Sequence, residues 1–259
     1  MELLTVRMDE ETLNAFKHFD EWVSIGDIAK ALKFAPPTAE KICWTLAGKG
    51  LALWKPGKRG KQLFKYNQRY GKKKEIDIFN KLDELLGRDY YITGETALFL
   101  YNLTDHAMYQ RIKEIAIPKN KYTELAEKIV EKLNTYATVL PDKIPKHCNK
   151  RNIVADALGI GDVVILRKAL NNPRNLKFYG DLNLPGIDVI LTELVLPDKK
   201  LFEYTLKAID FNLTDEEFKK LCLIKPTLLY LKKYLEGDKN IPDNILNAIR
   251  GAEKNARGY

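Results

Sequence analysis

The sequence of 259 residues predicts an α+β protein with two or three domains, at about 150 residues per domain. Three observations support this fold class. The N-terminal segment combines helical patterns with a two-stranded hairpin, the middle of the chain alternates strands and helices, and the end of the chain is helical. The predicted domains therefore cover residues 1–74, 75–197 and 198–259.

The N-terminal segment begins with apolar residues at helical spacing, which predict a first helix over residues 9–20. Ser24 is a good N-cap for a second helix, and Asp27 stands at the position of the acidic partner in a capping box. A third helix is expected to begin at Pro36, because proline costs little in a first helical turn. Gly48 and Gly50 are expected to end this helix through a left-handed conformation.

The third helix is expected to bury one stripe and to expose another. Ala39, Ile42 and Leu46 repeat at the spacing of a buried stripe. The exposed side combines short hydroxyls with lysines near the helix N-terminus, which suits major-groove and phosphate contacts. The predicted DNA-contacting residues of this helix are Pro37, Thr38, Lys41, Trp44, Thr45 and Lys49.

A hairpin follows this helix, with strands expected over residues 51–54 and 62–66 and a Pro-Gly turn between them. Its five cations are accompanied by no acid. Because surface hairpins normally mix their charges, this pattern favours contact with phosphates. The predicted DNA-contacting residues of the hairpin are Lys55, Lys58, Arg59, Lys61 and Lys65.

The order of helix, helix-turn-helix, strand, basic turn and strand resembles the winged helix-turn-helix family over residues 9–67. The resemblance implies that the third helix reads duplex DNA while the hairpin lies on the backbone. Some winged helices instead serve as protein-docking modules, and a docking scaffold is therefore an alternative.

The distribution of charge also favours a polyanionic partner. Residues 1–74 contain 15 Lys and Arg against 8 Asp and Glu, whereas the rest of the chain contains 28 against 27. A basic field focused on one segment raises the local concentration of nucleic acid. Residues 69–74 form a basic linker, which we expect to mark the first domain boundary.

The second domain is expected to begin with a helix over residues 75–86 and a strand over 90–92. A turn comprising Thr93, Gly94 and Glu95 follows, and a glycine turn that opens a helix is a possible phosphate or partner site. The segment resembles the opening of nucleotidyltransferase-like domains.

Catalytic members of those domains hold Mg²⁺ with two carboxylates on the next strand. Here the next predicted strand, residues 112–118, contains Glu114 alone. We therefore expect no catalytic residues, no metal site and no cofactor. A nucleotidyltransferase-like enzyme acting on nucleic acid or nucleotides is an alternative.

Residues 91–105 resemble the corresponding segment of the AbiEi-type antitoxin family, although that family usually has His-Gly-Leu where this chain has Tyr101-Asn102-Leu103. The order of domains over residues 10–140 is also similar. The resemblance implies an antitoxin that represses its own operon and counteracts a nucleotidyltransferase-type toxin, which is a functional partner without necessarily being a physical one. It leaves open whether the protein is a homodimer.

Later segments are assigned from apolar spacing and caps. A strand is expected over residues 138–140, and residues 153–158 and 163–170 are expected to be either two helices or a strand-helix pair. Thr214 is expected to cap a helix, and Pro242 to open a last helix that ends near Ala252. The tail from Lys254 is expected to fray.

The cysteines Cys43, Cys148 and Cys222 are far apart, so we expect neither a disulfide framework nor a thiolate zinc site. His147 and Cys148 resemble half of a metal site, but no second half lies at ligand spacing, and we expect a surface loop there. No apolar run approaches the ~18 residues of a membrane span. The absence of a signal-peptide pattern predicts a cytoplasmic protein. The few glutamines beside abundant Lys and Glu are typical of thermophiles.

Overall fold

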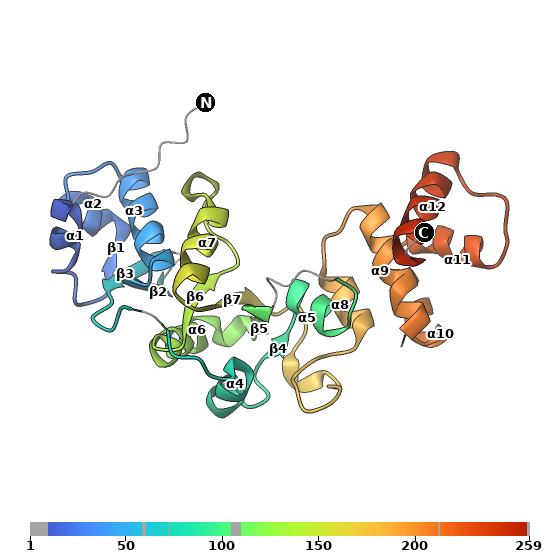
Figure 1. Cartoon of the computed structure of the whole chain (residues 1–259), viewed down its shortest axis with the longest axis horizontal. Coiled ribbons are helices and arrows are strands. Elements are labelled where there is room, and N and C mark those ends of the chain that lie inside the picture. The colour runs from blue at the N-terminus through green and yellow to red at the C-terminus, as the bar shows by residue number, and fades with distance from the viewer. Residues whose placement is uncertain (1–9, 59–60, 72, 105–109, 212, 258–259) are drawn as a thin grey trace. The chain divides into compact units, whose positions relative to one another are not determined.

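A computed structural model describes residues 10–58, 61–71, 73–104, 110–211 and 213–257 of the chain (Figure 1). It combines many helices with two small sheets, which confirms the predicted α+β class. The chain divides into two units, Met1–Tyr91 with Ala107–Asn175 and Ile92–His106 with Leu176–Tyr259.

The N-terminal module of the first unit forms a three-stranded antiparallel sheet in the order β1-β3-β2, accompanied by three helices. Its elements are α1 (Glu10–Phe16), β1 (Val23–Ser24), α2 (Ile25–Ala31), α3 (Pro36–Gly48), β2 (Ala52–Pro56) and β3 (Gln62–Tyr66). Phe16, Ile28, Leu46 and Phe64 have no exposed surface and form the centre of its core. The boundaries lie close to the predicted ones, although α1 is shorter than expected.

The rest of the first unit is built on a four-stranded sheet in the order β4-β5-β7-β6. Its elements are α4 (Ile78–Leu86), β4 (Tyr91–Ile92), β5 (Ile112–Ile117), α6 (Tyr122–Leu133), β6 (Ala137–Pro141), α7 (Lys150–Ile160) and β7 (Asp162–Lys168). Strands β5, β7 and β6 are parallel, and their side chains are almost all buried. Such continuous burial is typical of parallel strands covered on both faces. β7 is a strand over all of Asp162–Lys168, where a helix was one of the predicted alternatives.

Helices α6 and α7 cover opposite faces of this sheet, because the chain changes direction between them. The β5-α6-β6 connection passes over β7 in one direction, and the β6-α7-β7 connection returns by one strand. Right-handed crossovers in opposite directions place their helices on opposite faces. Figure 1 accordingly shows α7 above the sheet and α6 below it.

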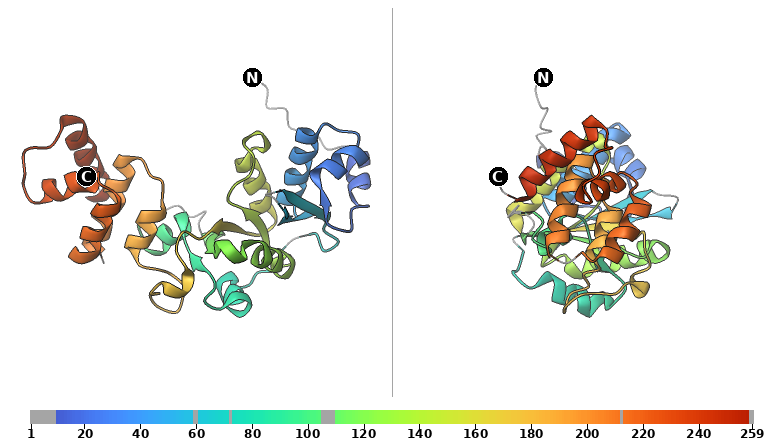
Figure 2. Two further views of the ribbon diagram at one scale, coloured as in Figure 1. Left: turned by 180° about the vertical axis from the view of Figure 1, so that it is seen from behind. Right: turned by 90° about the vertical axis from the view of Figure 1, so that its right-hand side faces the viewer.

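The N-terminal module packs directly against this sheet and its helices. Front and back views both show α7 beside α3 (Figures 1 and 2), and α6 packs against β2. The indole Nε1 of Trp54 in β2 donates a hydrogen bond to the Val139 carbonyl oxygen of β6 at 2.7 Å. The side-chain amides of Asn67 and Asn134 exchange two buried hydrogen bonds at 2.7 and 2.8 Å.

The basic linker is part of this interface and does not separate two bodies. Lys73 is 7% exposed, and its Nζ donates to the Asn134 carbonyl oxygen at 2.5 Å. The backbone N–H groups of Lys73 and Lys74 donate to the carbonyl oxygens of Ile160 and Thr135. The boundary predicted after residue 74 therefore falls inside the first unit.

Two glycines at the end of α3 have different roles. A Cβ on Gly48 would lie 2.7 Å from the Ile153 carbonyl oxygen of α7, so Gly48 permits the close approach of the two helices. Gly50 has a φ of 69° and supplies the left-handed conformation that ends the helical segment. The sequence predicted the left-handed role for both residues.

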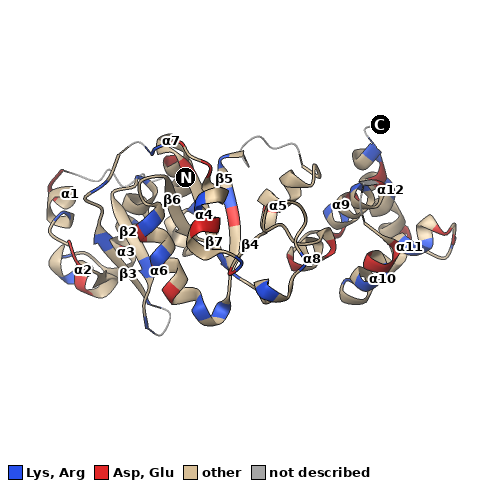
Figure 3. Cartoon of the chain, turned by 90° about the horizontal axis from the view of Figure 1, so that it is seen from below, with Lys and Arg blue, Asp and Glu red and all other residues tan. Residues whose placement is uncertain are grey.

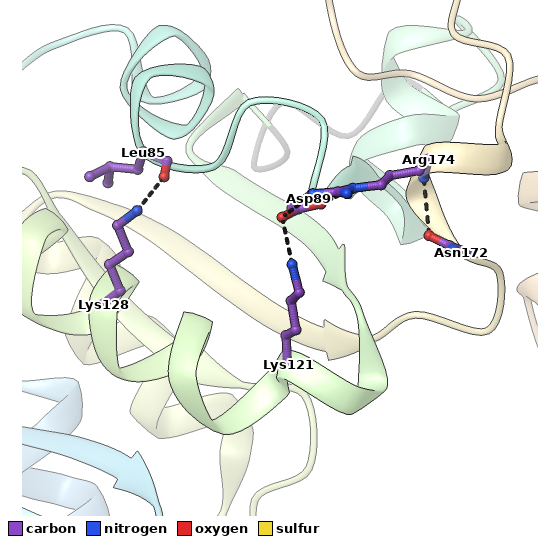
Figure 4. A network of polar contacts seen from close by, with 6 residues as sticks. All are labelled: Leu85, Asp89, Lys121, Lys128, Asn172 and Arg174. Atoms are coloured by element: carbon purple, nitrogen blue, oxygen red, sulfur yellow. Dashed lines mark hydrogen bonds and ion pairs between the residues drawn. The ribbon is translucent and has the colours of Figure 1, made fainter.

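An ion-pair network joins α4 and the end of the first unit to the start of α6 (Figure 4). The Asp89 carboxylate accepts hydrogen bonds from Arg174 Nε at 2.7 Å and from Lys121 Nζ at 3.2 Å. The bond from Arg174 is the main cause that lowers the pKa of Asp89, despite the opposing effect of burial. Lys128 donates to the Leu85 carbonyl oxygen, which fixes the end of α4 on α6.

The second unit is helical, with α9 packed along α12 and α8 packed against both α5 and α10. Its helices are α5 (Gly94–Leu100), α8 (Ile187–Glu193), α9 (Asp198–Phe211), α10 (Asp215–Ile224), α11 (Leu228–Leu235) and α12 (Asp243–Arg257). Thr214 forms the expected cap, completed into a capping box by Glu217.

Two features of this unit differ from the prediction. Helices α5 and α8 belong to it and not to the α/β sheet. Helix α12 extends to Arg257, past the point where fraying was expected, because Glu253 pairs with Arg257 and accepts a hydrogen bond from Tyr234. Among the described residues, no helix combines the length and apolar character that crossing a membrane requires.

Candidate nucleic-acid interface

Helix α3 is held in place by the caps and turn that precede it. The Ser24 hydroxyl accepts a hydrogen bond from the Asp27 N–H at 3.2 Å, as the predicted N-cap requires, and donates to the Asp27 carboxylate at 2.6 Å. Lys33 adopts a left-handed conformation with a φ of 56°, which turns the chain between α2 and α3. Pro36 and Pro37 then occupy the first two positions of α3.

One stripe of α3 remains exposed on the N-terminal module. Pro37, Thr38 and Lys49 are exposed, while Lys41 and Thr45 are half-buried. The Thr45 hydroxyl donates to the Lys41 carbonyl oxygen at 2.9 Å, so its lone pairs remain as acceptors. Five of the six contact residues predicted on this helix therefore lie on one accessible stripe.

Trp44 is the exception, and its predicted contact with DNA is wrong for this structure. It has no exposed surface and packs against Trp54 and Phe64, with ring centroids 5.8 and 5.0 Å apart. It therefore belongs to the core that joins α3 to the hairpin. The stripe periodicity placed it on the border between the two faces, where sequence alone does not decide.

The hairpin carries its exposed cations at the turn. Strands β2 and β3 pair from Ala52 with Tyr66 to Pro56 with Gln62, and the Gly57 N–H donates to the Lys61 carbonyl oxygen at 2.6 Å. The side chains of Lys58 and Lys61 are exposed. Arg59, which the sequence also predicts as a DNA contact, lies outside the described residues.

The two cations on the strands themselves are already bound within the unit. Lys55 pairs with Glu127 at 2.5 Å and Lys65 with Glu131 at 2.9 Å, both acids lying on α6. Both ammonium groups also lie over the Trp22 ring, at 4.7 and 4.4 Å from its centroid. Figure 3 marks the cations of the hairpin in blue and the acids of α6 in red.

These pairs correct the prediction that the hairpin presents unbalanced positive charge. The prediction considered only charges within the hairpin, whereas the neutralising acids belong to α6, which lies far along the chain. Lys55 and Lys65 are partly buried and paired with acids, so they present less free positive charge than the prediction assumed. The exposed positive charge of the described hairpin is concentrated at Lys58 and Lys61.

A second group of cations lies beside the module and was not assigned to the site from the sequence. An open cavity of about 780 Å³ is lined by Ser24 to Gly26, Glu40, Lys61, Gln62 and residues 142–146. Lys143 and Lys146 are exposed and line this cavity together with Lys61. Their basic loop was visible in the sequence, but only the fold brings it next to α2 and β3.

The turn predicted to bind a phosphate or a partner is closed by a carboxylate. Thr93 is 2% exposed and its hydroxyl donates to Glu193 Oε2 at 3.1 Å. Gly94 is buried with a φ of 63°, and Glu95 is half-buried at the start of α5, a helix of 7 residues. A phosphate beside this turn would meet the negative charge of Glu193, which disfavours the predicted phosphate site.

The lone acid of the strand β5 is also engaged. Glu114 is 6% exposed and pairs with Arg167 of β7 at 2.8 Å. Arg167 Nε lies 3.7 Å from Asp142 as well. The guanidinium of Arg167 therefore lies beside these carboxylates, where a catalytic pair of carboxylates would hold a metal ion.

Comparison of the chain with models of protein families, with curated proteins and with solved structures finds no match. The resemblance to AbiEi-type antitoxins therefore stays a prediction. The functional interpretation rests on the geometry of the N-terminal module.

Proposed function

We propose that this chain is a DNA-binding transcriptional regulator whose N-terminal module is a winged helix-turn-helix. In this proposal α3 enters the major groove and the β2-β3 turn contacts the backbone. The observation that carries it is the accessible stripe of α3, which is accompanied by the exposed lysines of the adjacent turn. In this stripe Pro37, Thr38 and Lys49 are exposed and Lys41 and Thr45 are half-buried.

The order and pairing of the elements support this reading. Three helices followed by a hairpin, with β1 paired to β3 and β3 to β2, is the arrangement expected for a winged helix. Hydroxyl and lysine side chains on α3 suit base-edge and phosphate contacts. Lys143 and Lys146 extend the cationic surface past the hairpin and give the backbone further contacts.

The other two functions have less support. Nucleotidyl transfer needs carboxylates that are available to a metal ion, and the buried Glu114 is paired with Arg167. A docking role would use apolar contacts, whereas the accessible stripe of α3 is made of Pro, Thr and Lys. The role as an antitoxin against a nucleotidyltransferase-type toxin follows from the resemblance alone and is proposed on that basis.

The proposal is tested by the salt dependence of binding to duplex DNA. With about five phosphate contacts, the logarithm of the association constant should fall with the logarithm of salt concentration at a slope of about −4 to −5. Fluorescence anisotropy with labelled genomic fragments from the region upstream of the gene provides the measurement. An affinity that does not change with salt would contradict the proposal and favour a docking module.

Sequence-specific contact is tested separately from backbone contact. Thr38→Ala and Lys41→Ala on α3 should alter the preference between target and random duplexes, because these residues lie where base edges are read. Lys58→Ala should instead weaken binding to both duplexes by a similar factor. If Thr38→Ala and Lys58→Ala change both duplexes equally, α3 is not the recognition helix.

A further inference from the structure

Three side chains that commonly bind metal ions converge between α3 and η4 (Lys146–Cys148). Glu40 comes from α3, and His147 and Cys148 come from η4. One ligand atom from each lies within 4.8 Å of the other two, and Glu40 Oε2 is 3.1 Å from His147 Nε2. Glu40 is the second half that the sequence lacked beside His147 and Cys148, because it is distant along the chain.

The set contains one oxygen, one nitrogen and one sulfur donor. Thiolate and imidazole select Zn²⁺ over Mg²⁺ and Ca²⁺, which prefer oxygen ligands. The ligands are partly enclosed, since Cys148 is 3% exposed and the side chains of Glu40 and His147 are 22% and 47% exposed. This arrangement differs from an exposed acidic cluster, because its soft donor is buried and its other two donors reach solvent.

The surroundings leave the cluster open to solvent on one side. Glu40 lines the open cavity of about 780 Å³, so an ion reaches the cluster from solvent without passing through the core.

We propose that Glu40, His147 and Cys148 form a Zn²⁺ site in which water occupies the fourth position. Three protein ligands with one open position is a common arrangement for zinc. The bound ion would cross-link α3 to the segment that precedes α7. Cys43 lies one turn after Glu40 on α3 and outside the group of three, so it is not assigned as a ligand. The inference does not depend on DNA binding.

The direct test is titration of the full chain with Zn²⁺ in competition with a chromophoric chelator. We expect one Zn²⁺ per chain and a rise in the melting temperature on saturation, because an ion that binds only the folded state stabilises it. Replacement by Co²⁺ should give the charge-transfer absorption of a thiolate ligand. His147→Ala and Cys148→Ser should each weaken binding at least about 10-fold, the smallest loss expected even from a supporting residue.

Matched variants separate the site from general effects of the substitutions. His18→Ala removes an exposed histidine, and Cys222→Ser alters a buried thiol of the second unit. Both should bind Zn²⁺ like the wild type. Because His147 is exposed, His147→Ala keeps the test valid even if Cys148→Ser fails to fold. The proposal is overturned if the wild type binds no Zn²⁺, if His147→Ala binds as tightly as the wild type, or if the Co²⁺ spectrum lacks the thiolate band.

Discussion

The two faces of α3 differ in what they contact. The face that contains Glu40, Cys43 and Gly48 packs against η4 and α7, whereas the stripe from Pro37 to Lys49 remains accessible. The hairpin has the same division, since Lys55 and Lys65 pair with α6 while Lys58 and Lys61 stay exposed. Positive charge along a sequence is therefore not equivalent to positive charge available to a ligand, because neighbouring elements neutralise part of it.

Trp44 lies on the border between the two faces of α3, so its substitution is the strongest test of this division. Trp44→Ala should lower the free energy of unfolding by about 3–5 kcal/mol, because it empties the space between Trp54 and Phe64. Chemical denaturation of the full chain measures the change. A variant with unchanged stability and weakened DNA binding would indicate that Trp44 contacts DNA.

The contact between α3 and α7 is tested by a glycine pair. Gly48→Ala should cost about 1–3 kcal/mol, because its Cβ would lie 2.7 Å from the Ile153 carbonyl oxygen, which belongs to the backbone. Gly159→Ala in α7 is the matched control, since nothing lies within 4 Å of its Cβ. It should stabilise the protein by roughly 0.5–1 kcal/mol through helix propensity. Equal effects of the two substitutions would mean that α3 and α7 do not approach closely.

The pH dependence of stability tests whether Lys73 of the linker is buried in the folded chain. Burial lowers the pKa of Lys73 from 10.5 to about 8. Between these values the unfolded chain binds more protons than the folded one, so this lysine makes stability rise with pH over that interval. Lys73→Met should remove that part of the rise, which is measured as the difference between the two stability curves. Parallel curves from pH 8 to 10.5 would show that Lys73 is solvated.

The sequence predicted the elements of the N-terminal module well because their signals are local. Ser24 and Asp27 cap α2, two prolines open α3, and the hairpin strands occupy almost the expected residues. Apolar spacing also identified the buried positions Ala39, Ile42 and Leu46.

The remaining differences come from contacts between distant parts of the chain. Glu127 and Glu131 neutralise two hairpin lysines, Glu193 closes the turn at Thr93, and Arg167 pairs with Glu114. None of these partners is visible from spacing within a motif. Glu40 is likewise distant along the chain from His147 and Cys148, so spacing within a motif does not connect the three residues.

If only the outward cations contact DNA, two variants should differ in the salt dependence of their DNA binding. The first variant replaces Lys49, Lys58 and Lys61 with alanine, and the second replaces Lys55 and Lys65. Each phosphate contact that is lost reduces the slope of log affinity against log salt by about 1. We therefore expect the first variant to reduce the magnitude of the slope by about 3 and the second to leave it nearly unchanged. A larger reduction in the second variant than in the first would show that the inward cations, and not the outward ones, contact the phosphates.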